Sequence, residues 1–210
     1  VSSISSYFGG HIMLRHAIKA QFTNVEMTRM GQNNVLGRYP IHFHFLHDVT
    51  GDPAGSFLVA NCSVHHNYQR CVVVHETHGV TIQDNAAFDT LGHCYFLEEG
   101  GERYNVFDGN LGILARSVPK ENNLVFPAVV RRLIPTDSSA SIFWITNPEN
   151  TFTNNVAVGG RFGFWFLPPV RPIGASAYLY PIDSPIRPRL TAVTLFRDNV
   201  AHSASETGFH

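Results

Sequence analysis

Several common signals are scarce or missing in this 210-residue sequence. It has three cysteines, an odd number without a Cys-x-x-Cys pair, which argues against a zinc knuckle or a dithiol redox motif. The formal net charge is −1, so bulk electrostatics predict no nucleic-acid partner and no anionic-membrane partner. The longest apolar clusters, such as FGFWFLPPV, are far too short to span a bilayer, so we expect membrane attachment only through other parts of a longer chain.

Helical periodicity is also nearly absent. The apolar fraction of 44% is ordinary for a globular protein, and it falls in short runs of Val, Ile, Phe and Tyr between Gly, Asn and Asp. This pattern predicts strands and turns. The chain begins at Val1 without an initiator methionine, a basic region or a leader-like apolar run. We therefore expect a fragment of a larger extracellular protein.

The strand-like segments repeat. VANCSVHHNYQRCVVVHE (59–76) aligns without a gap with IQDNAAFDTLGHCYFLEE (82–99), at an offset of 23 residues. The same frame recurs with looser spacing in ASIFWITNP (140–148), in 152–169 and in 196–210, and upstream in YPIHFHFL. A period of about 23 residues without helices predicts an all-β, right-handed parallel β-helix, of the pectate-lyase-like solenoid type, as a single module over residues 1–210.

A β-sandwich is the alternative fold, but equal-length repeats and a shortage of tight Asn-Gly hairpins argue against it. In the β-helix, Asn61, Asp84, Asn154 and Asp198 recur near one corner, where stacked polar side chains would satisfy turn backbone groups. Asn61 also begins a formal glycosylation sequon, NCS, although a corner ladder would be a poor place for a glycan.

The repeat also predicts which side chains stack. Equivalent residues in neighbouring rungs lie ~4.8 Å apart and form columns, and successive side chains alternate between the two faces. Two inward columns are expected, Ile41, Val72, Tyr95 and Phe43, Val74, Leu97. The opposite face would carry two further columns, His42, Val73, Phe96 and His44, His75, Glu98.

The column of His44, His75 and Glu98 is the candidate catalytic and metal site. A divalent metal such as zinc suits two imidazoles and a carboxylate, whereas calcium would need more oxygen ligands than the pattern supplies. Alternatively, Glu98 and a histidine would act as acid and base on a glycosidic bond, or the column would only bind sugar hydroxyls. A half-exposed polar column without chemistry is an equally good interpretation.

Other side chains are candidates for substrate binding, together with His42. Arg70 and His93 are equivalent residues at the start of their strands, and Arg70 would hold a uronate carboxylate or bond turn carbonyls. His65 and His66 precede a turn, and at most one of them would face a given site, so we select His66.

Two further features leave alternatives open. The side chains of Trp144, Phe164, Trp165 and Phe166 would form a sugar-stacking platform, or half of them would be core. Cys71 and Cys94 are equivalent in the repeat, and they would form a disulfide in an oxidising compartment or remain buried thiols.

Six phrases then resemble, in order, the β-helix region of the G8-domain family: GRYPIHFH, CSVHHNYQRCVVVHE, DTLGHCYFLEEG, FWITNPEN, GFWF and NVAHS. That family includes cell-surface hyaluronidases, cell-migration-inducing hyaluronan-binding proteins and fibrocystin-like proteins. The likeness runs from about Gly9 to the end. The proline-rich segment 170–190 does not align clearly, and the G8 domain expected upstream is missing.

The resemblance implies an extracellular or cell-surface module, which in the fibrocystin-like branch can be ciliary. In the hyaluronidase branch it implies cleavage of an acidic polysaccharide, with these side chains as matching site candidates: His42, His44, His65, His66, His75, His93 and Glu98. In the fibrocystin-like branch it implies a structural or adhesive role without chemistry. Expected partners are an acidic polysaccharide or cell-surface glycan and other domains of the parent chain.

Overall fold

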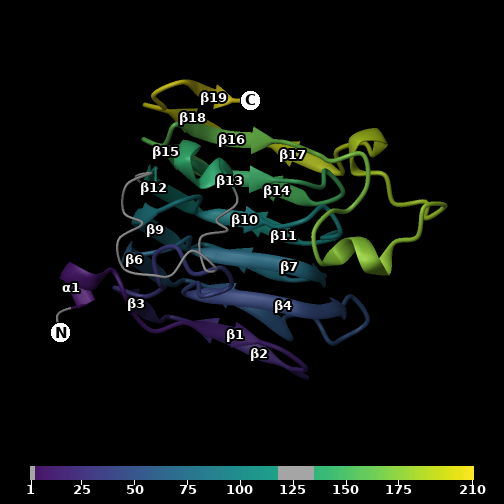
Figure 1. The fold of residues 1–210 in the computed structure, drawn as a ribbon, viewed down its shortest axis with the longest axis horizontal. Coiled ribbons are helices and arrows are strands. Elements are labelled where there is room, and N and C mark those ends of the chain that lie inside the picture. Colours follow the sequence, from purple (N-terminus) through teal and green to yellow (C-terminus); the bar gives the residue numbers. More distant parts are fainter. Residues whose placement is uncertain (1–2, 118–134) are drawn as a thin grey trace.

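The computed structural model describes residues 3–117 and 135–210, which form stacked rungs of short strands (Figure 1). Three sheets run along the stack, and the strands pair in parallel. The first sheet contains β1 (Ile12–Leu14), β4 (Ile41–Asp48), β7 (Val72–His78), β10 (Tyr95–Leu97), β13 (Ser141–Ile145), β16 (Phe162–Phe166) and β19 (Thr207–Phe209).

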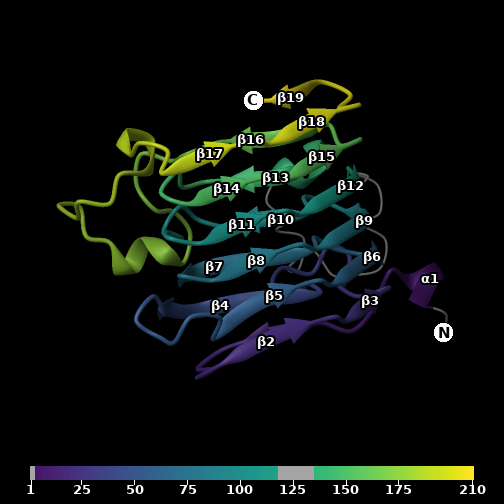
Figure 2. The same ribbon diagram turned by 180° about the vertical axis from the view of Figure 1, so that it is seen from behind.

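The other two sheets lie behind the first one (Figure 2). The second sheet contains β2 (Ala20–Thr23), β5 (Phe57–Ala60), β8 (Thr81–Gln83), β11 (Val106–Asp108), β14 (Thr151–Thr153) and β17 (Leu195–Arg197). The third sheet contains β3 (Glu26–Thr28), β6 (Ser63–Asn67), β9 (Ala86–Leu91), β12 (Leu111–Arg116), β15 (Val156–Val158) and β18 (Val200–His202). The parallel β-helix is thereby confirmed, and the β-sandwich is excluded.

The predicted register is also confirmed. Val72 pairs with Ile41 on one side and with Tyr95 on the other, as the repeat required. All three side chains are buried in the interior. The column continues upward as an aromatic stack, in which the ring of Phe143 lies 4.8 Å from that of Tyr95 and 4.5 Å from that of Phe164. The core therefore fills the space between the three sheets, and the outer faces remain available for a site.

The corner between the second and third sheets has a left-handed residue in each rung. Asn61, Asp84, Asn154 and Asp198 have φ between 53° and 57°, the region in which Asn and Asp are tolerated best after glycine. Gly109 occupies the equivalent position in its own rung, with φ 67°. This backbone conformation explains why the repeat carries a polar residue or glycine there.

The hydrogen-bonded ladder at this corner lies one residue later than predicted. The amides of Asn85, Asn110, Asn155 and Asn199 follow the left-handed residues. In the first three, Nδ2 donates to the Oδ1 of the asparagine in the next rung at 2.9–3.0 Å. The same Oδ1 atoms accept backbone N–H groups of the rung before. The side chains of Asn61 and its equivalents are exposed, so the sequon residue is not part of the ladder.

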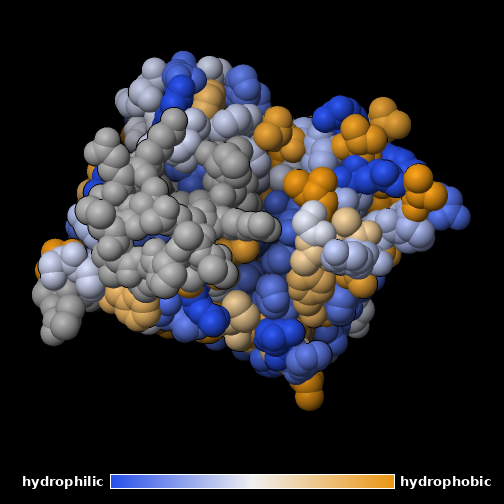
Figure 3. All heavy atoms as spheres, in the orientation of Figure 1, coloured by the Kyte–Doolittle hydropathy of each residue, from blue (hydrophilic) through white to orange (hydrophobic). Residues whose placement is uncertain are grey.

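Segments outside the repeat cover parts of the stack. A short helix α1 (Ser3–Ser6) lies beside β3 and β6, and η2 (Pro135–Ser139) precedes β13. Residues 167–194, which we call the arm, project from one side and contain η3 (Ser176–Leu179) and η4 (Pro188–Leu190). Hydrophobic side chains are exposed on the arm (Figure 3), among them Val170, Ile173, Ile182 and Leu190. No helix among the described residues is long and apolar enough to cross a membrane.

Candidate functional site

The predicted histidine column lies on the outer face of the first sheet. β4 carries His42 and His44 on the same side of the strand, and His44 pairs with His75 of β7. Glu98 follows β10, and its backbone N–H donates to the carbonyl oxygen of Val74, which places it beside His75. We call His42, His44 and His75 the imidazole cluster; the structure brings all three together, together with Glu98.

The expected half-exposed position of the column is wrong for most of its members. Within the column, His75 and Glu98 are only 6% and 5% exposed, and His44 alone is half-buried; His42, from the neighbouring column, is 1% exposed. The outer face is covered because Tyr39, Val73, Phe96 and Trp144 form a second apolar cluster there, with Trp165 packed against it. The members of the imidazole cluster are therefore largely withdrawn from bulk water.

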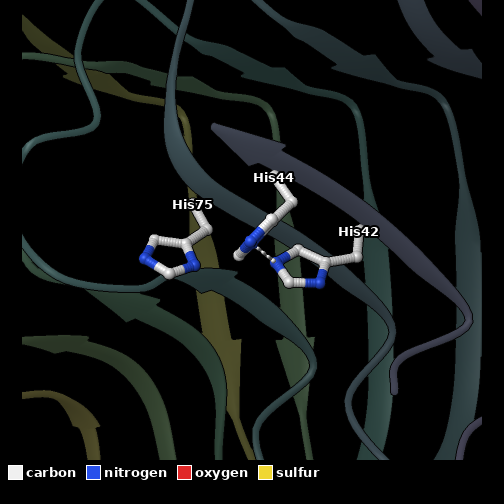
Figure 4. Close-up of side chains that lie close together, drawn as sticks. All are labelled: His42, His44 and His75. Atoms are coloured by element: carbon white, nitrogen blue, oxygen red, sulfur yellow. Dashed lines mark hydrogen bonds between the residues drawn. The ribbon is translucent and has the colours of Figure 1, made fainter. Parts of the chain in front are cut away.

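The three imidazoles converge (Figure 4). His44 Nδ1 lies 3.3 Å from His42 Nε2, and the ring centroids of His44 and His75 are 4.9 Å apart. One ring nitrogen from each of the three residues lies within 4.8 Å of the others. This is the spacing at which three side chains can share one metal ion.

Hydrogen bonds on the far side of two rings fix which nitrogen points inward. His42 Nδ1 lies 3.1 Å from the carbonyl oxygen of Gly37, which can only accept, so Nδ1 carries the proton and Nε2 faces the cluster. His75 Nε2 lies 2.8 Å from Glu99 Oε2, which likewise directs Nδ1 inward. Metal-binding histidines typically have such outer partners.

Glu98 completes the arrangement. Its Oε2 lies 3.7 Å from His42 Nε2 and 3.5 Å from His75 Nδ1. Within the described part of the chain, Glu98 Oε2 and His75 Nδ1 are buried atoms without a hydrogen-bond partner. Two unsatisfied polar atoms facing each other are costly unless another group lies between them. A divalent transition metal fits this donor set of imidazole nitrogens and one carboxylate oxygen, and the set adds His42 to the predicted ligands.

The imidazoles have opposite charge preferences. Burial and the neighbouring His44 hold the pKa of His42 well below its usual range, and burial together with His75 lowers the pKa of His44 to about 4. Burial also disfavours a charge on His75, but Glu98 and the hydrogen bond that His75 donates to Glu99 outweigh it and raise its pKa to about 9. Without a metal, His75 is the protonated member at neutral pH.

These shifts predict a stability maximum near pH 6.5 for the metal-free protein. The contribution of His75 is fully present below pH 6.5 and is lost as the pH rises through 9, which amounts to roughly 3 kcal/mol at 1.36 kcal/mol per unit. The contribution of neutral His44 is present above pH 6.5 and is lost as the pH falls through 4. Denaturant unfolding with a chelator, between pH 4 and 10, measures both limbs. His75→Gln should flatten the alkaline limb, and a flat wild-type profile between pH 6.5 and 9 would contradict the assignment.

Arg70 is not positioned as a surface clamp for a uronate. It is fully buried, and its guanidinium donates to the Tyr39 hydroxyl at 2.9 Å and to Asp137 Oδ2 at 3.1 Å. A further nitrogen–oxygen distance of 3.6 Å joins it to Glu98 Oε1. The alternative that Arg70 bonds turn carbonyls does not describe these contacts either. Its guanidinium holds the carboxylate of Glu98 from behind, with Oε2 left facing the imidazoles.

The remaining predicted binding residues lie in different parts of the structure. His93 is buried, with its Nδ1 2.8 Å from Ser141 Oγ, and its ring packs against Trp144 of the outer-face apolar cluster. His66 belongs to the third sheet and does not approach the imidazole cluster; together with His65 it lines a separate cleft, so both neighbours face one place. Trp144 and Phe164 are buried, which supports the core interpretation of the aromatic run over the platform.

Some contributing residues were missed from the sequence. Glu99 accepts a hydrogen bond from His75 and also from the backbone N–H groups of Ala175 and Ser176 in the arm. Its position next to Glu98 was a usable signal. Asp137, which pairs with Arg70, lies in a segment outside the repeat, where the column argument gives no signal.

The two stacked cysteines form a disulfide. Cys71 and Cys94 are bonded across neighbouring rungs, with a Cα–Cα distance of 4.6 Å, while Cys62 is a buried free cysteine. The disulfide lies immediately before β7 and β10, the strands that lead to His75 and Glu98. It therefore ties together the two rungs from which half of the site is built.

The chain is similar to one family model and to several known proteins. Residues 7–209 match the model of a family described as CEMIP beta-helix. The human protein named cell surface hyaluronidase CEMIP2 is 38% identical over 217 residues, covering 96% of this chain and 15% of that protein. Communication mutant protein F of Dictyostelium discoideum is 37% identical, covering 97% and 18%. The human cell migration-inducing and hyaluronan-binding protein is 34% identical, covering 96% and 16%. The chain thus spans less than a fifth of the length of these relatives.

Proposed function

The chain belongs to the CEMIP beta-helix family, and from that premise we propose that it is the glycan-directed module of a cell-surface or extracellular protein that cleaves a hyaluronan-like polysaccharide. The observation that carries the proposal is the convergence of one ring nitrogen each from His42, His44 and His75 within 4.8 Å of one another. The unsatisfied Oε2 of Glu98 lies beside two of these rings, 3.7 Å from His42 Nε2 and 3.5 Å from His75 Nδ1. Two relatives named for hyaluronan support the choice of polysaccharide.

The proposed reaction is hydrolysis of a glycosidic C–O bond, in which water adds a hydroxyl to the anomeric carbon and a proton to the leaving oxygen. His42, His44, His75 and Glu98 would hold a divalent metal, zinc being the ion that the donor set suits best, and the metal would supply Lewis acidity. His44 is the half-buried member, so its edge is where a sugar would meet the cluster. Binding of the metal requires neutral His75, and its proton would be released.

Arg70 and Tyr39 have positioning roles in this proposal. Both residues contact Glu98 Oε1: the Tyr39 hydroxyl lies 3.4 Å from it, and a guanidinium nitrogen of Arg70 lies 3.6 Å from it. They would keep Oε2 directed at the imidazoles without touching the polysaccharide. Burial raises the pKa of Tyr39 above its usual value, so its hydroxyl remains a hydrogen-bond donor.

The test measures metal content and hyaluronan chain length on the intact protein. We expect one equivalent of zinc after dialysis, and shortening of high-molecular-weight hyaluronan on size-exclusion chromatography. His44→Gln should lower the cleavage rate at least about 100-fold and release the metal, because it removes a ligand that is not needed to fill the core. His202→Gln is the matched control, since His202 is an exposed histidine of β18.

The outcomes separate the parts of the proposal. If the metal-free protein cleaves hyaluronan and Glu98→Gln does not, the same residues act by acid–base catalysis and not through a metal. Absence of cleavage by the zinc-loaded wild-type protein would overturn the enzymatic role.

A structural or adhesive role, at the cell surface or on a cilium, is the second candidate. The burial of His42, His75 and Glu98 favours it, because a buried polar network can specify the packing of the outer face without taking part in any reaction. This candidate predicts that His44→Gln changes neither hyaluronan length nor metal content.

A further inference from the structure

A separate cleft is lined by residues of α1, β3, β6, β9 and β12 and of the turns that follow them. Figure 2 shows these strands stacked in the third sheet, with α1 beside β3. Its volume is about 460 Å³, within the range of small-molecule sites. Basic side chains dominate its polar lining, namely Arg29, Arg116, His65 and His66, with Asp89 as the acidic member. The hydroxyl-bearing rings of Tyr7 and Tyr68 form one wall, 5.6 Å apart and edge to face.

Stacking of the rungs builds this basic lining. Thr28 of β3 pairs with His65 of β6, and the residue after each is left-handed, Arg29 with φ 56° and His66 with φ 53°. Asp89 in the next rung is left-handed as well, with φ 54°. The repeated backbone conformation therefore brings Arg29, His66 and Asp89 from three successive rungs to one corner.

Among the described residues at this corner, one arginine has no ion-pair partner. Arg116 pairs with Asp89, and His65 Nε2 lies 2.9 Å from Glu26 Oε1. Arg29 is exposed, and within residues 3–117 and 135–210 no carboxylate lies within ion-pair distance of it. A concave surface with an unpaired guanidinium, a second arginine and tyrosine rings suits a sugar that carries a carboxylate.

We propose that this cleft is a second binding site, which takes the carboxylate of a uronate-containing oligosaccharide through Arg29 and Arg116. The site is distinct from the imidazole cluster, since its residues belong to the third sheet and to α1. Tyr68 follows β6, and the chain runs on through Arg70 into β7, which carries His75. The site binds and does no chemistry.

Two variants of the intact protein test the site in opposite directions. Arg29→Asn removes the free charge, and asparagine suits a left-handed residue, so the backbone should not change. It should weaken binding of a hyaluronan tetrasaccharide at least about tenfold in isothermal titration. Asp89→Asn keeps the same backbone preference and frees Arg116, so it should tighten binding several-fold.

Controls separate this site from the proposed catalytic one. Arg197→Gln, at an exposed arginine of the second sheet, should bind the tetrasaccharide like the wild type. The titrations contain a chelator, which removes any metal from the proposed catalytic site, so binding at the cleft can be measured whether or not hyaluronan is cleaved. A neutral tetrasaccharide of N-acetylglucosamine should bind at least tenfold more weakly. Unchanged affinity in Arg29→Asn, or equal affinity for the neutral sugar, would overturn the assignment.

Discussion

Replacing Arg70 by methionine is expected to lower the free energy of unfolding of this module by about 3–5 kcal/mol, the cost typical of removing one partner from a buried ion pair. The guanidinium is fully buried and has two acidic neighbours, Asp137 and Glu98, which are themselves buried. Methionine fills the volume of the side chain but leaves both carboxylates without their cation. The pKa of Arg70 is raised because Asp137, Tyr39 and Glu98 together outweigh the effect of burial, so the residue is charged whenever the protein is folded.

Packing adds to the electrostatic loss. The Arg70 guanidinium carbon lies 3.7 Å from the centre of the Phe96 ring and 4.7 Å from that of Tyr39, both inside the apolar cluster that covers the outer face. The free energy of unfolding of Arg70→Lys should lie between those of the wild type and Arg70→Met. Lysine keeps the positive charge, but it lacks the planar guanidinium that contacts Tyr39 and Asp137 together.

Urea unfolding at pH 7 measures these differences. Arg197→Gln, at an exposed arginine, should stay within about 0.5 kcal/mol of the wild type. The double variant Arg70→Met/Glu98→Gln should be more stable than additivity predicts, since it removes one of the stranded charges. A loss below 1 kcal/mol in Arg70→Met would show that the pairs do not hold the folded state.

Removing the disulfide is expected to cost about 3 kcal/mol, the value for closing a loop of this length in the chain-entropy account. Cys71 and Cys94 are 23 residues apart in sequence. Backbone hydrogen bonds at this position do not depend on the sulfur atoms, since the N–H groups of Cys71 and Val72 both donate to the carbonyl oxygen of Cys94. The Cys71→Ala/Cys94→Ala variant should therefore fold in the same register with lower stability.

Reduction of the wild-type protein provides the internal control. With excess dithiothreitol, its unfolding midpoint in urea should fall close to that of the double variant, and the double variant should not respond to the reductant. Equal midpoints for the wild type with and without reductant would contradict the expected contribution.

The repeat was sufficient to predict the parts of the fold that repeat. The gap-free offset between 59–76 and 82–99 places Val72 on Tyr95, and the histidine segment places His44 on His75; both pairings occur. A parallel strand has one register that buries its apolar face, so pattern and pairing are tightly linked. The predicted asparagine ladder was one residue too early, because the left-handed residue and the ladder amide are adjacent polar positions in the sequence. In the rung that contains Asn61, the ladder position is occupied by Cys62, which hides the pattern.

Burial of the site could not be predicted in the same way. Part of the burial comes from segments outside the repeat: Asp137 of η2 reaches Arg70, and the backbone of Ala175 and Ser176 in the arm binds Glu99. Alternation along a strand predicts which side chains share a face, but it does not predict whether that face is exposed to solvent. His42 was therefore placed on the correct side of β4 but not among the interacting imidazoles.

The asparagine ladder has a consequence for how such a molecule changes in size. Its hydrogen-bonded amides are separated by 25, 45 and 44 residues along the chain, yet each step is one rung. Added residues thus widen the molecule at its turns and leave its height unchanged, as the arm does. Lineages that lengthen or shorten these turns can reshape the outer surface while the strands that carry the histidines keep their level.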